Sequence, residues 1–373
     1  MKKIDYPHFR TALLEWFNTY QREMPWRNTG DAYRIWVSEV MLQQTQVKKV
    51  MEYYQKFIDR FPTVQHLAEA ELQTVLKLWE GLGYYTRARN LHKAAQIIVK
   101  ELDGEIPDDY AAFRKLPGVG DYSAAAVQSI AFNAPYAAVD GNVKRVLARL
   151  FYMKIPINDA SATRQFQEKA DAFLAQDAPG NFNQAMMELG ATVCRPQSPT
   201  CIVCPVHSFC QAFQTARQDE VPVRRKAKPI PEYHLAVGVI HKVGAAGVLA
   251  ESAEEPAGEI LITQRPLDGL LGGLWEFPGG RLAEGETAEE ACRRNIAETV
   301  NLAVDNLTYL TRVRHAFTHF KIVVDVFQCE YLAGEVALNG PINAKWIRFE
   351  EIEQYPFPRS NHKFIPMLNK RNG

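Results

Sequence analysis

The chain has 373 residues, of which 47% are hydrophobic and 23% charged, a balance typical of globular proteins with buried cores. No stretch is apolar enough for a membrane span, and residues 1–8 lack the apolar core of a secretion signal, so we expect a cytoplasmic protein. The formal net charge is zero, which argues against a uniformly basic nucleic-acid binder.

Charge and sequence pattern both change near residue 233. From there onward, 14 Lys and Arg stand against 18 Asp and Glu, so this part carries −4 and residues 1–232 carry +4. Helical periods give way to strand-like runs at the same place. We predict two domains, residues 1–216 and 233–373, joined by an extended, basic, proline-rich connector at residues 217–232. The predicted strands are His234–Lys242, Glu259–Arg265, Leu307–Val313 and Phe320–Leu332.

The first predicted helix covers residues 5–22, where apolar and aromatic side chains recur at helical spacing. Pro25 ends it. The next two residues, Trp26 and Arg27, place an aromatic plane beside a planar cation, a pair suited to stacking on a nucleobase or hydrogen-bonding to it. From the residues alone, a packing Trp next to a solvated Arg is the simpler interpretation.

Glu39 stands on the apolar face of a second helix, predicted from about residue 33 to 54. Ile35, Trp36 and Leu42 lie three or four positions away, so the carboxyl shares its face with apolar side chains. Burial there raises a carboxyl pKa, which is what an acid catalyst near neutral pH needs. The alternative is a surface glutamate beside an apolar stripe.

Residues 116–120, Leu-Pro-Gly-Val-Gly, predict a hairpin between two short helices, with Asp121 as the N-cap of the second. Gly118 and Gly120 lack Cβ atoms and flank Val119. The loop amides can therefore approach another backbone or bind an anion such as phosphate. An ordinary helix-turn-helix corner is the alternative.

Asp140 opens the helix that follows Pro135. There the helix dipole and the unpaired amides favour the ionised carboxylate. Glu39 in an apolar setting and Asp140 at a helix mouth form a pair whose pKa values are pushed apart, the pattern of an acid and an anion. A plain N-cap aspartate is the alternative.

Four cysteines lie within 17 positions, spaced Cys-x6-Cys-x2-Cys-x5-Cys: Cys194, Cys201, Cys204 and Cys210. Because disulfides are not expected in the cytoplasm, these thiols predict one metal centre. A tetrathiolate zinc site is one physical possibility. Cys292 and Cys329 lie far away along the chain and are expected to be buried free thiols.

The hairpin, followed by Val139-Asp140-Gly141-Asn142-Val143, resembles the helix-hairpin-helix, Gly/Pro-Asp class of DNA base-excision glycosylases. Nearly the whole chain is similar to one family of that class, the adenine DNA glycosylases. The resemblance implies a multidomain fold, in which an all-α helix-hairpin-helix domain precedes an α+β Nudix-like domain. It also implies that the four clustered cysteines hold a [4Fe-4S] cluster, with zinc as the alternative.

The implied reaction is removal of adenine opposite 8-oxoguanine or guanine in double-stranded DNA, by a monomer in a bacterial-type cytoplasm, associated with the nucleoid. The implied catalytic residues are Glu39, Asp140, Tyr122 and Asn142. The family positions for binding adenine match Trp26, Arg27, Leu42 and Gln184, and those for wedging the base stack match Gln44 and Tyr84. The implied 8-oxoguanine contacts are Phe317, Thr318 and His319, and Gly118, Val119 and Gly120 would contact the DNA backbone.

Three departures from related patterns refine these expectations. Strand-cleaving members of the class have a lysine at the position of Tyr122, and a phenol cannot form the Schiff base, so we expect a monofunctional glycosylase. Leu274–Gly280, Glu286 and Arg294 resemble a Nudix loop–helix–loop. Asn295 and Thr299 replace carboxylates of its magnesium site, which favours a recognition fold over a hydrolase. Thr318 stands where the family usually has serine and adds a methyl group to the 8-oxoguanine contact.

Three other functions remain as alternatives at this stage. A bifunctional glycosylase-lyase for oxidised pyrimidines is disfavoured by Tyr122 and by the added domain. A non-catalytic, cluster-bearing DNA-binding module is disfavoured by the carboxyl pair. Nucleotide pyrophosphatase activity of the C-terminal half is disfavoured by the incomplete Nudix motif.

Overall fold

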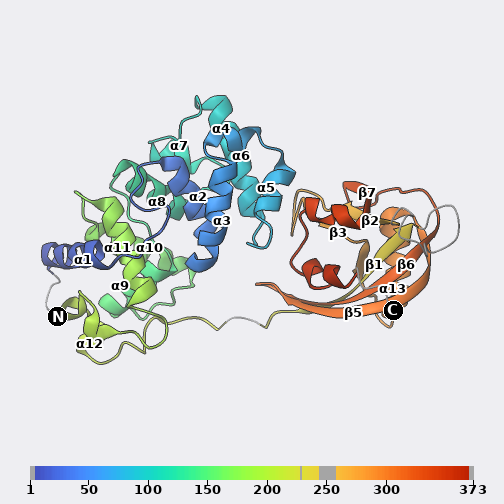
Figure 1. The fold of residues 1–373 in the computed structure, drawn as a ribbon. Coiled ribbons are helices and arrows are strands. Elements are labelled where there is room, and N and C mark those ends of the chain that lie inside the picture. The colour runs from blue at the N-terminus through green and yellow to red at the C-terminus, as the bar shows by residue number, and fades with distance from the viewer. Residues whose placement is uncertain (1–4, 227–228, 243–257, 369–373) are drawn as a thin grey trace. The chain divides into compact units, whose positions relative to one another are not determined.

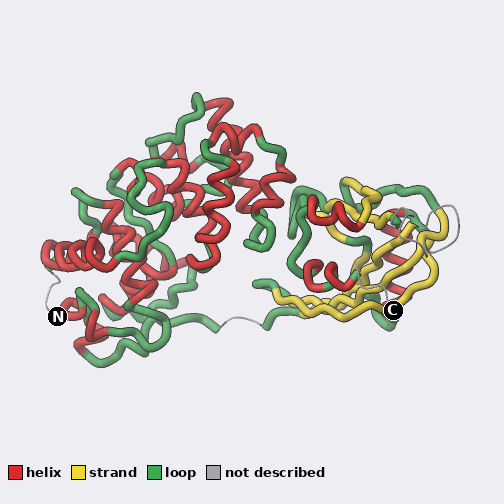
Figure 2. The backbone as a smooth tube through the Cα atoms, in the orientation of Figure 1, coloured by secondary structure: helices red, strands yellow, loops and turns green. Residues whose placement is uncertain are grey.

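The computed structural model describes residues 5–226, 229–242 and 258–368. The chain separates into two compact units, Met1–Glu69 with Asn90–Ala227, and Ala70–Arg89 with Lys228–Gly373. Helices build the first unit and a sheet dominates the second (Figures 1 and 2). This confirms the predicted fold class.

The unit boundaries differ in two ways from those that the sequence pattern predicts. The second unit begins near residue 228, and it includes residues 70–89, which the sequence pattern assigns to the helical domain. Residues 227 and 228 of the predicted connector lie outside the described residues, as do residues 1–4 of the N-terminal segment.

The helices of the first unit follow one another through short loops. Their bounds are α1 Tyr6–Tyr20, α2 Ala32–Leu42, α3 Val47–Arg60, α4 Val64–Glu69, α6 Thr86–Glu101 (which begins in the second unit), α7 Tyr110–Arg114, α8 Asp121–Phe132, α9 Gly141–Leu150, α10 Thr163–Phe173, α11 Pro179–Thr192 and α12 Gln211–Gln214. Short 3₁₀ turns lie at η1 Ala160–Ala162, η2 Cys201–Val203 and η3 His207–Phe209.

The helix predicted over residues 33–54 is divided in two, which corrects the sequence prediction. Helix α2 ends at Leu42 and α3 begins at Val47. Between them the backbone of Gln44 adopts the left-handed conformation, with φ at 55°, which no regular helix permits. The break places residues 43–46 in a loop at the end of α2.

Four helices of the first unit, α2, α8, α9 and α11, pack on one another and carry most of the predicted site residues. Gly190 shows how closely α9 and α11 approach, since a Cβ atom there would lie 2.7 Å from the Cβ atom of Asn142. Asn142 is thereby held against α11. The core beside these helices is built from apolar side chains such as Phe9, Leu147 and Phe182.

The second unit is a mixed sheet in the order β3-β2-β1-β6-β5, with β4 paired to β1 and β7 paired to β2. Strands β1 and β6 are parallel, and the other pairs are antiparallel. The bounds are α5 Leu72–Leu78, β1 Glu232–Lys242, β2 Glu259–Gln264, β3 Trp275–Glu276, β4 Gly279–Arg281, α13 Ala288–Val300, β5 Ala303–Ala316, β6 Lys321–Ala333 and β7 Asn343–Arg348, with 3₁₀ turns η4 Phe349–Gln354, η5 Asn361–Lys363 and η6 Ile365–Met367.

Alternation along β1 gives the sheet two apolar faces. Ala236 and Ile240 pack with Ile296 of α13, whereas Val239 faces the cluster around Phe277 and Phe357. The four strands predicted from the sequence are present, and the short strands β3, β4 and β7 add to them. Cys292 and Cys329 are buried free thiols, as predicted.

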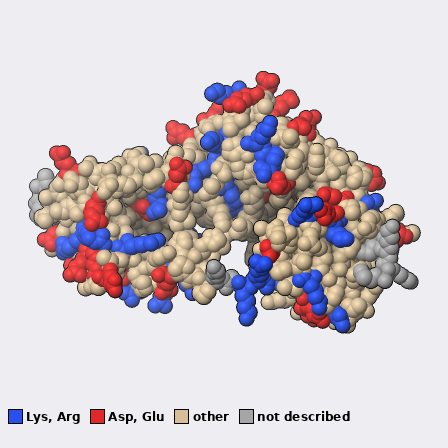
Figure 3. Space-filling view, turned by 180° about the vertical axis from the view of Figure 1, so that it is seen from behind, with Lys and Arg blue, Asp and Glu red and all other residues tan. Residues whose placement is uncertain are grey.

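The side of the molecule that Figure 3 presents carries charges of both signs. Basic and acidic side chains are interspersed there, in keeping with the zero net charge. Across the described ranges, no helix combines the length and apolarity that a membrane crossing requires.

Candidate active site

A pocket of about 910 Å³ opens among α2, α8, α9 and α11 of the first unit. Glu39 and Asp140 both line it, although 100 residues separate them in the sequence. The condition that the sequence analysis could not test, one cavity flanked by both carboxyl groups, is therefore met. Nine other predicted site residues also line it: Trp26, Arg27, Leu42, Gln44, Gly118, Gly120, Tyr122, Asn142 and Gln184.

The carboxyl group of Glu39 is buried, with 5% of the residue exposed. Burial raises its pKa to about 7, and the negative charge of Asp140 adds to the increase. Two groups lower the pKa of Glu39: the hydroxyl of Tyr122, which donates to Oε2 at 2.7 Å, and the positive charge of Arg27. A large fraction of Glu39 is therefore protonated at neutral pH, as an acid catalyst requires.

Asp140 caps α9, as predicted. Its Oδ1 accepts from the amide of Val143 at 2.7 Å, and its Oδ2 accepts from Nδ2 of Asn142 at 2.8 Å. The sequence analysis expected these donors to favour the ionised form. Burial outweighs them and raises the pKa of Asp140 above its ordinary value, which corrects that expectation.

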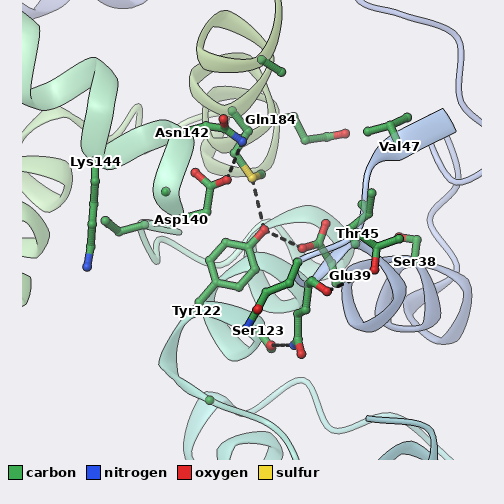
Figure 4. Close-up of a pocket in the computed structure, with 18 of the residues that line it drawn as sticks. Ser38, Glu39, Thr45, Val47, Tyr122, Ser123, Asp140, Asn142, Lys144 and Gln184 are labelled. Atoms are coloured by element: carbon green, nitrogen blue, oxygen red, sulfur yellow. Dashed lines mark hydrogen bonds between the residues drawn. The ribbon is translucent and has the colours of Figure 1, made fainter. Parts of the chain in front are cut away.

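Tyr122 stands between the two carboxyl groups. Figure 4 shows its hydroxyl pointing toward Glu39, with Asp140 on the other side of the ring. The hydroxyl also lies 3.3 Å from the sulfur of Met187. Burial, followed by the charges of Glu39 and Asp140, raises the pKa of Tyr122, so the phenol stays protonated and serves as a donor.

A chain of hydrogen bonds leads from Asp140 to the cysteine region. The Oδ1 of Asn142 accepts from the guanidinium of Arg145 at 2.7 Å. The same guanidinium donates to the carbonyl of Gly190 at 2.7 Å and, through Nε, to the carbonyl of Cys194 at 2.8 Å. The buried Arg145 thus holds both Cys194, the first of the four cysteines, and Asn142, which in turn bonds to Asp140.

Glu188 organises the part of the pocket that contains Arg27, and the sequence analysis missed it. Its carboxylate accepts from Arg27 at 2.6 Å and from Nε and Nη2 of Arg22 at 2.6 and 2.9 Å. Burial pushes the pKa of Glu188 upward, but the bonds from the two arginines outweigh it and lower the pKa. One signal was available, because Glu188 lies four residues after Gln184 and thus on the same helix face.

For the reaction that the resemblance implies, adenine excision, we expect Glu188→Gln to lower kcat/KM by roughly 10- to 100-fold, because Arg27 loses its ionised partner and its fixed direction. Glu188→Asp, which keeps the charge, should recover part of the loss. The matched control is Glu168→Gln, which removes an exposed ion pair with Arg164 and should leave the rate unchanged. A normal rate for Glu188→Gln would show that Arg27 needs no such partner.

The hairpin carries Gly118 and Gly120 on the rim of the same pocket, while Val119 between them is buried. Gly118 has φ at 76°, and a Cβ atom there would lie 2.7 Å from the Cβ of Asn90. Gly120 faces open space. It also serves as the N-cap of α8, the position predicted for Asp121, which is the first residue of that helix.

Trp26 packs edge-on against Tyr54 with only 7% exposed, so it is both core and pocket wall. The loop after α2 exposes Gln44 at the pocket rim, while Gln43 beside it donates to the hydroxyl of Ser123 at 3.0 Å. Gln184 projects into the pocket from α11 (Figure 4). The structure thus brings together every predicted adenine-binding residue.

The second unit brings Tyr84 to the loop between β5 and β6. The hydroxyl groups of Tyr84 and Thr318 are 2.5 Å apart, and His319 next to them is exposed. Phe317 stacks on Phe320 with 4.7 Å between ring centroids. The predicted wedge tyrosine and the predicted 8-oxoguanine loop therefore form one cluster.

The four clustered cysteines occupy one stretch between α11 and the start of α12. Burial is the main cause that raises the pKa of Cys204 to about 12 and of Cys210 to about 11, and the other thiols of the group add to the increase. Arg149 donates to the sulfur of Cys194 at 3.3 Å. N–H donors directed at sulfur suit thiolate ligands of a metal centre.

Over the described ranges, no three His, Cys, Asp or Glu side chains converge on a point where a single metal ion could sit. A tetrahedral zinc ion needs its four sulfur atoms about 2.3 Å from one centre. An iron–sulfur cluster is a larger body, and its ligands stand farther apart. Four thiols are the ligand set of both a tetrathiolate zinc ion and a [4Fe-4S] cluster.

Comparison with known proteins agrees with this architecture. Residues 37–171 match the family described as HhH-GPD superfamily base excision DNA repair protein, and residues 252–367 match the NUDIX domain family. Among solved structures, a thermostable thymine-DNA glycosylase aligns with a TM-score of 0.52 at 28% identity, over 56% of this chain and 97% of that one.

The adenine DNA glycosylase of Homo sapiens is 36% identical over 398 residues, which span 92% of this chain and 70% of that protein. The chain belongs to the adenine DNA glycosylase family. The Schizosaccharomyces pombe adenine DNA glycosylase is 34% identical over 380 residues, with 87% of this chain and 82% of that protein covered. The predicted resemblance is confirmed, and this adenine DNA glycosylase homologue is a base-excision-repair enzyme.

Proposed function

We propose that this family member hydrolyses the N-glycosidic bond of adenine mispaired with 8-oxoguanine, or with guanine, in double-stranded DNA. One observation carries the proposal: a buried, protonatable Glu39 and a helix-capping Asp140 line the same pocket, with Tyr122 between them. The pocket volume of about 910 Å³ is ample for an extruded purine nucleoside.

In the proposed mechanism, Glu39 donates its proton to N7 of the extruded adenine. The bond between C1′ and N9 then breaks, its electron pair leaves with the base, and positive charge develops on the sugar. Asp140 stabilises that oxocarbenium-like cation electrostatically or by transient attachment to C1′. The ionised Glu39 finally takes a proton from the water that attacks C1′, which restores its acid form.

The other pocket residues hold the reactants in place. Trp26, Leu42 and Gln184 enclose the base, and Arg27, fixed by Glu188, directs its donors toward it. Asn142 orients the Asp140 carboxylate through the bond to Oδ2.

Contacts to the rest of the duplex come from both units. Gln44 and Tyr84 are proposed to wedge the base stack where adenine leaves it, and the loop Phe317-Thr318-His319 to contact 8-oxoguanine. The amides of Gly118, Val119 and Gly120 would bind the DNA backbone. The bond between Tyr84 and Thr318 supports a shared role for the wedge and the 8-oxoguanine loop.

We also propose that Cys194, Cys201, Cys204 and Cys210 hold a [4Fe-4S] cluster. When bound, such a cluster ties the loop between α11 and α12 into one rigid piece, and base hydrolysis requires no electrons from it. Arg145 and Arg149 fix the first cysteine through its carbonyl and its sulfur.

The decisive experiment uses duplexes with one adenine opposite 8-oxoguanine, guanine or thymine. We expect alkali-labile sites at the adenine opposite 8-oxoguanine and guanine and none opposite thymine, and no strand break before alkali treatment because Tyr122 offers no amine. Absence of excision from all three duplexes would refute the proposed function. Strand cleavage by elimination at the rate of base loss would refute the monofunctional assignment.

Nucleotide pyrophosphatase activity of the second unit is the alternative function that the structure disfavours most. Arg294 forms ion pairs with Glu286 at 2.7 Å and with Glu298 at 2.9 Å. Two carboxylates of the Nudix pattern are therefore paired with an arginine. Asn295 donates to the carbonyls of Ala291 and Arg281 at 2.7 and 3.2 Å, bonds that a carboxylate could not make. We expect no magnesium-dependent hydrolysis of 8-oxo-dGTP, measured as pyrophosphate release beside a Nudix hydrolase as positive control.

A further inference from the structure

The pocket extends past Asp140 to a side that neither the sequence analysis nor the proposed mechanism uses. We call this the α9–α10 side, defined by Lys144, Ile157, Asn158, Thr163, Gln167 and Arg224. Its residues are polar or cationic except for Ile157. In Figure 4, Lys144 lies on the side of Asp140 opposite to Glu39 and Tyr122. This side of the pocket therefore suits an anion better than an adenine ring.

Arg224 reaches this side because the beginning of the predicted connector docks on the first unit. The amide of Ile157 donates to the carbonyl of Val223 at 3.0 Å. The side chain of Asn158 forms two bonds with the backbone of Arg225, donating to its carbonyl at 3.1 Å and accepting from its amide at 3.0 Å. The backbone is thus fixed on both sides of Arg224, so this part of the connector, which its composition predicts to be extended and semi-rigid, lies against the first unit.

The two neighbouring arginines differ in their partners. Arg225 forms an ion pair with Asp159 at 2.5 Å, which neutralises its charge. Across residues 5–226, 229–242 and 258–368, Arg224 forms no ion pair or hydrogen bond with another residue. The ammonium group of Lys144, which lines the same side, donates to a neutral hydroxyl, that of Thr163, at 3.3 Å. Arg224 therefore presents an uncompensated guanidinium at the rim of the pocket.

We propose that Arg224 binds a backbone phosphate adjacent to the nucleotide extruded into this pocket. The inference rests on the proposed function, because an extruded nucleoside at Glu39 and Asp140 necessarily brings its two flanking phosphates to the pocket rim. A guanidinium matches a phosphodiester through two parallel hydrogen bonds, and its docked backbone reduces the ordering cost of the contact. Arg224 is a substrate-binding residue that positions the sugar over Asp140.

The test compares full-length wild type with Arg224→Gln, Arg224→Lys and the neighbouring control Arg225→Gln. Binding is measured on an A:8-oxoguanine duplex whose adenosine carries 2′-fluorine, which disfavours the cationic transition state and slows cleavage. We expect Arg224→Gln to weaken binding about 10-fold and to reduce the slope of log K against log salt by about 0.9, the value for one phosphate contact. Arg224→Lys should keep the slope, and Arg225→Gln should change neither quantity.

Neutral methylphosphonate linkages, placed singly 5′ or 3′ of the adenosine, then identify the phosphate. One of the two should weaken wild-type binding about 10-fold and leave Arg224→Gln unaffected, because the contact is already lost. Equal salt slopes for wild type and Arg224→Gln, additive losses with both linkages, or an equal loss in Arg225→Gln would each overturn the assignment. Excision of adenine by wild type from the unmodified duplex is measured first. Its absence would refute the proposed function, whereas excision without an Arg224 effect refutes only this inference.

Discussion

Glu39→Gln is expected to lower the single-turnover rate of adenine excision by at least about 1000-fold. The amide has nearly the shape of the protonated acid and can still accept the hydrogen bond from Tyr122, so the pocket keeps its packing. It cannot release a proton to N7. The rate is measured with enzyme in excess over an A:8-oxoguanine duplex, followed by alkali cleavage.

Two controls separate acid catalysis from loss of structure. Glu168→Gln, on the exposed surface of α10, makes the same chemical change and should retain the wild-type rate. Binding of the duplex by Glu39→Gln should stay within a fewfold of wild type. A variant that binds and excises normally would remove Glu39 from the mechanism.

The pH profile gives a second readout of the same prediction. Because burial raises the pKa of Glu39 to about 7, kcat/KM should fall about tenfold per pH unit well above that value. Tyr122→Phe removes a donor that stabilises the ionised form, so the pKa of Glu39 should rise further and the alkaline limb should move to higher pH. A limb that stays in place would show that another group controls it.

Thermal unfolding reports the same pKa shift. A carboxyl whose pKa is 4.5 when unfolded and about 7 when folded contributes stability that is present below pH 4.5 and is lost as the pH rises through 7. Glu39→Gln has no such ionisation. Above pH 7 the variant should therefore unfold at a higher temperature than wild type, a stability gain that accompanies lost function.

The features of this site that depend on neighbouring residues in the chain could be predicted from the sequence. Glu39 among apolar neighbours and Asp140 after a proline-ended helix are recognisable because helix spacing and capping are short-range properties. The four cysteines are equally visible in the sequence. Whether the two carboxyl groups meet depends on the packing of α2, α8, α9 and α11, which no local pattern contains.

Other features depend on long-range packing and escaped prediction. Glu188 looks like an ordinary polar residue on α11 until the fold places Arg22 and Arg27 against it. The pKa of Asp140 rises because burial, a tertiary property, outweighs the helix-terminal donors that the sequence reveals. Residues 70–89 have a helical pattern, yet contacts such as Trp275 donating to Gln73 at 2.9 Å include them in the second unit.

Asp140→Asn is expected to lower the excision rate by about 1000-fold while leaving the fold intact. Asparagine caps helices as well as aspartate does, so the amide of Val143 keeps an acceptor and α9 keeps its first turn. The variant loses the negative charge that would oppose the developing cation on the sugar. Circular dichroism and single-turnover kinetics test the two halves of this statement independently.

The pH profile distinguishes Asp140→Asn from a general loss of activity. The charge of Asp140 raises the pKa of Glu39, so its removal should move the alkaline limb to lower pH, opposite to the shift expected for Tyr122→Phe. The acid limb, which reflects protonation of Asp140 at its raised pKa, should disappear because asparagine does not titrate. An unmoved alkaline limb would mean that the two carboxyl groups do not interact, and the acid–anion pair proposed for this pocket would have to be abandoned.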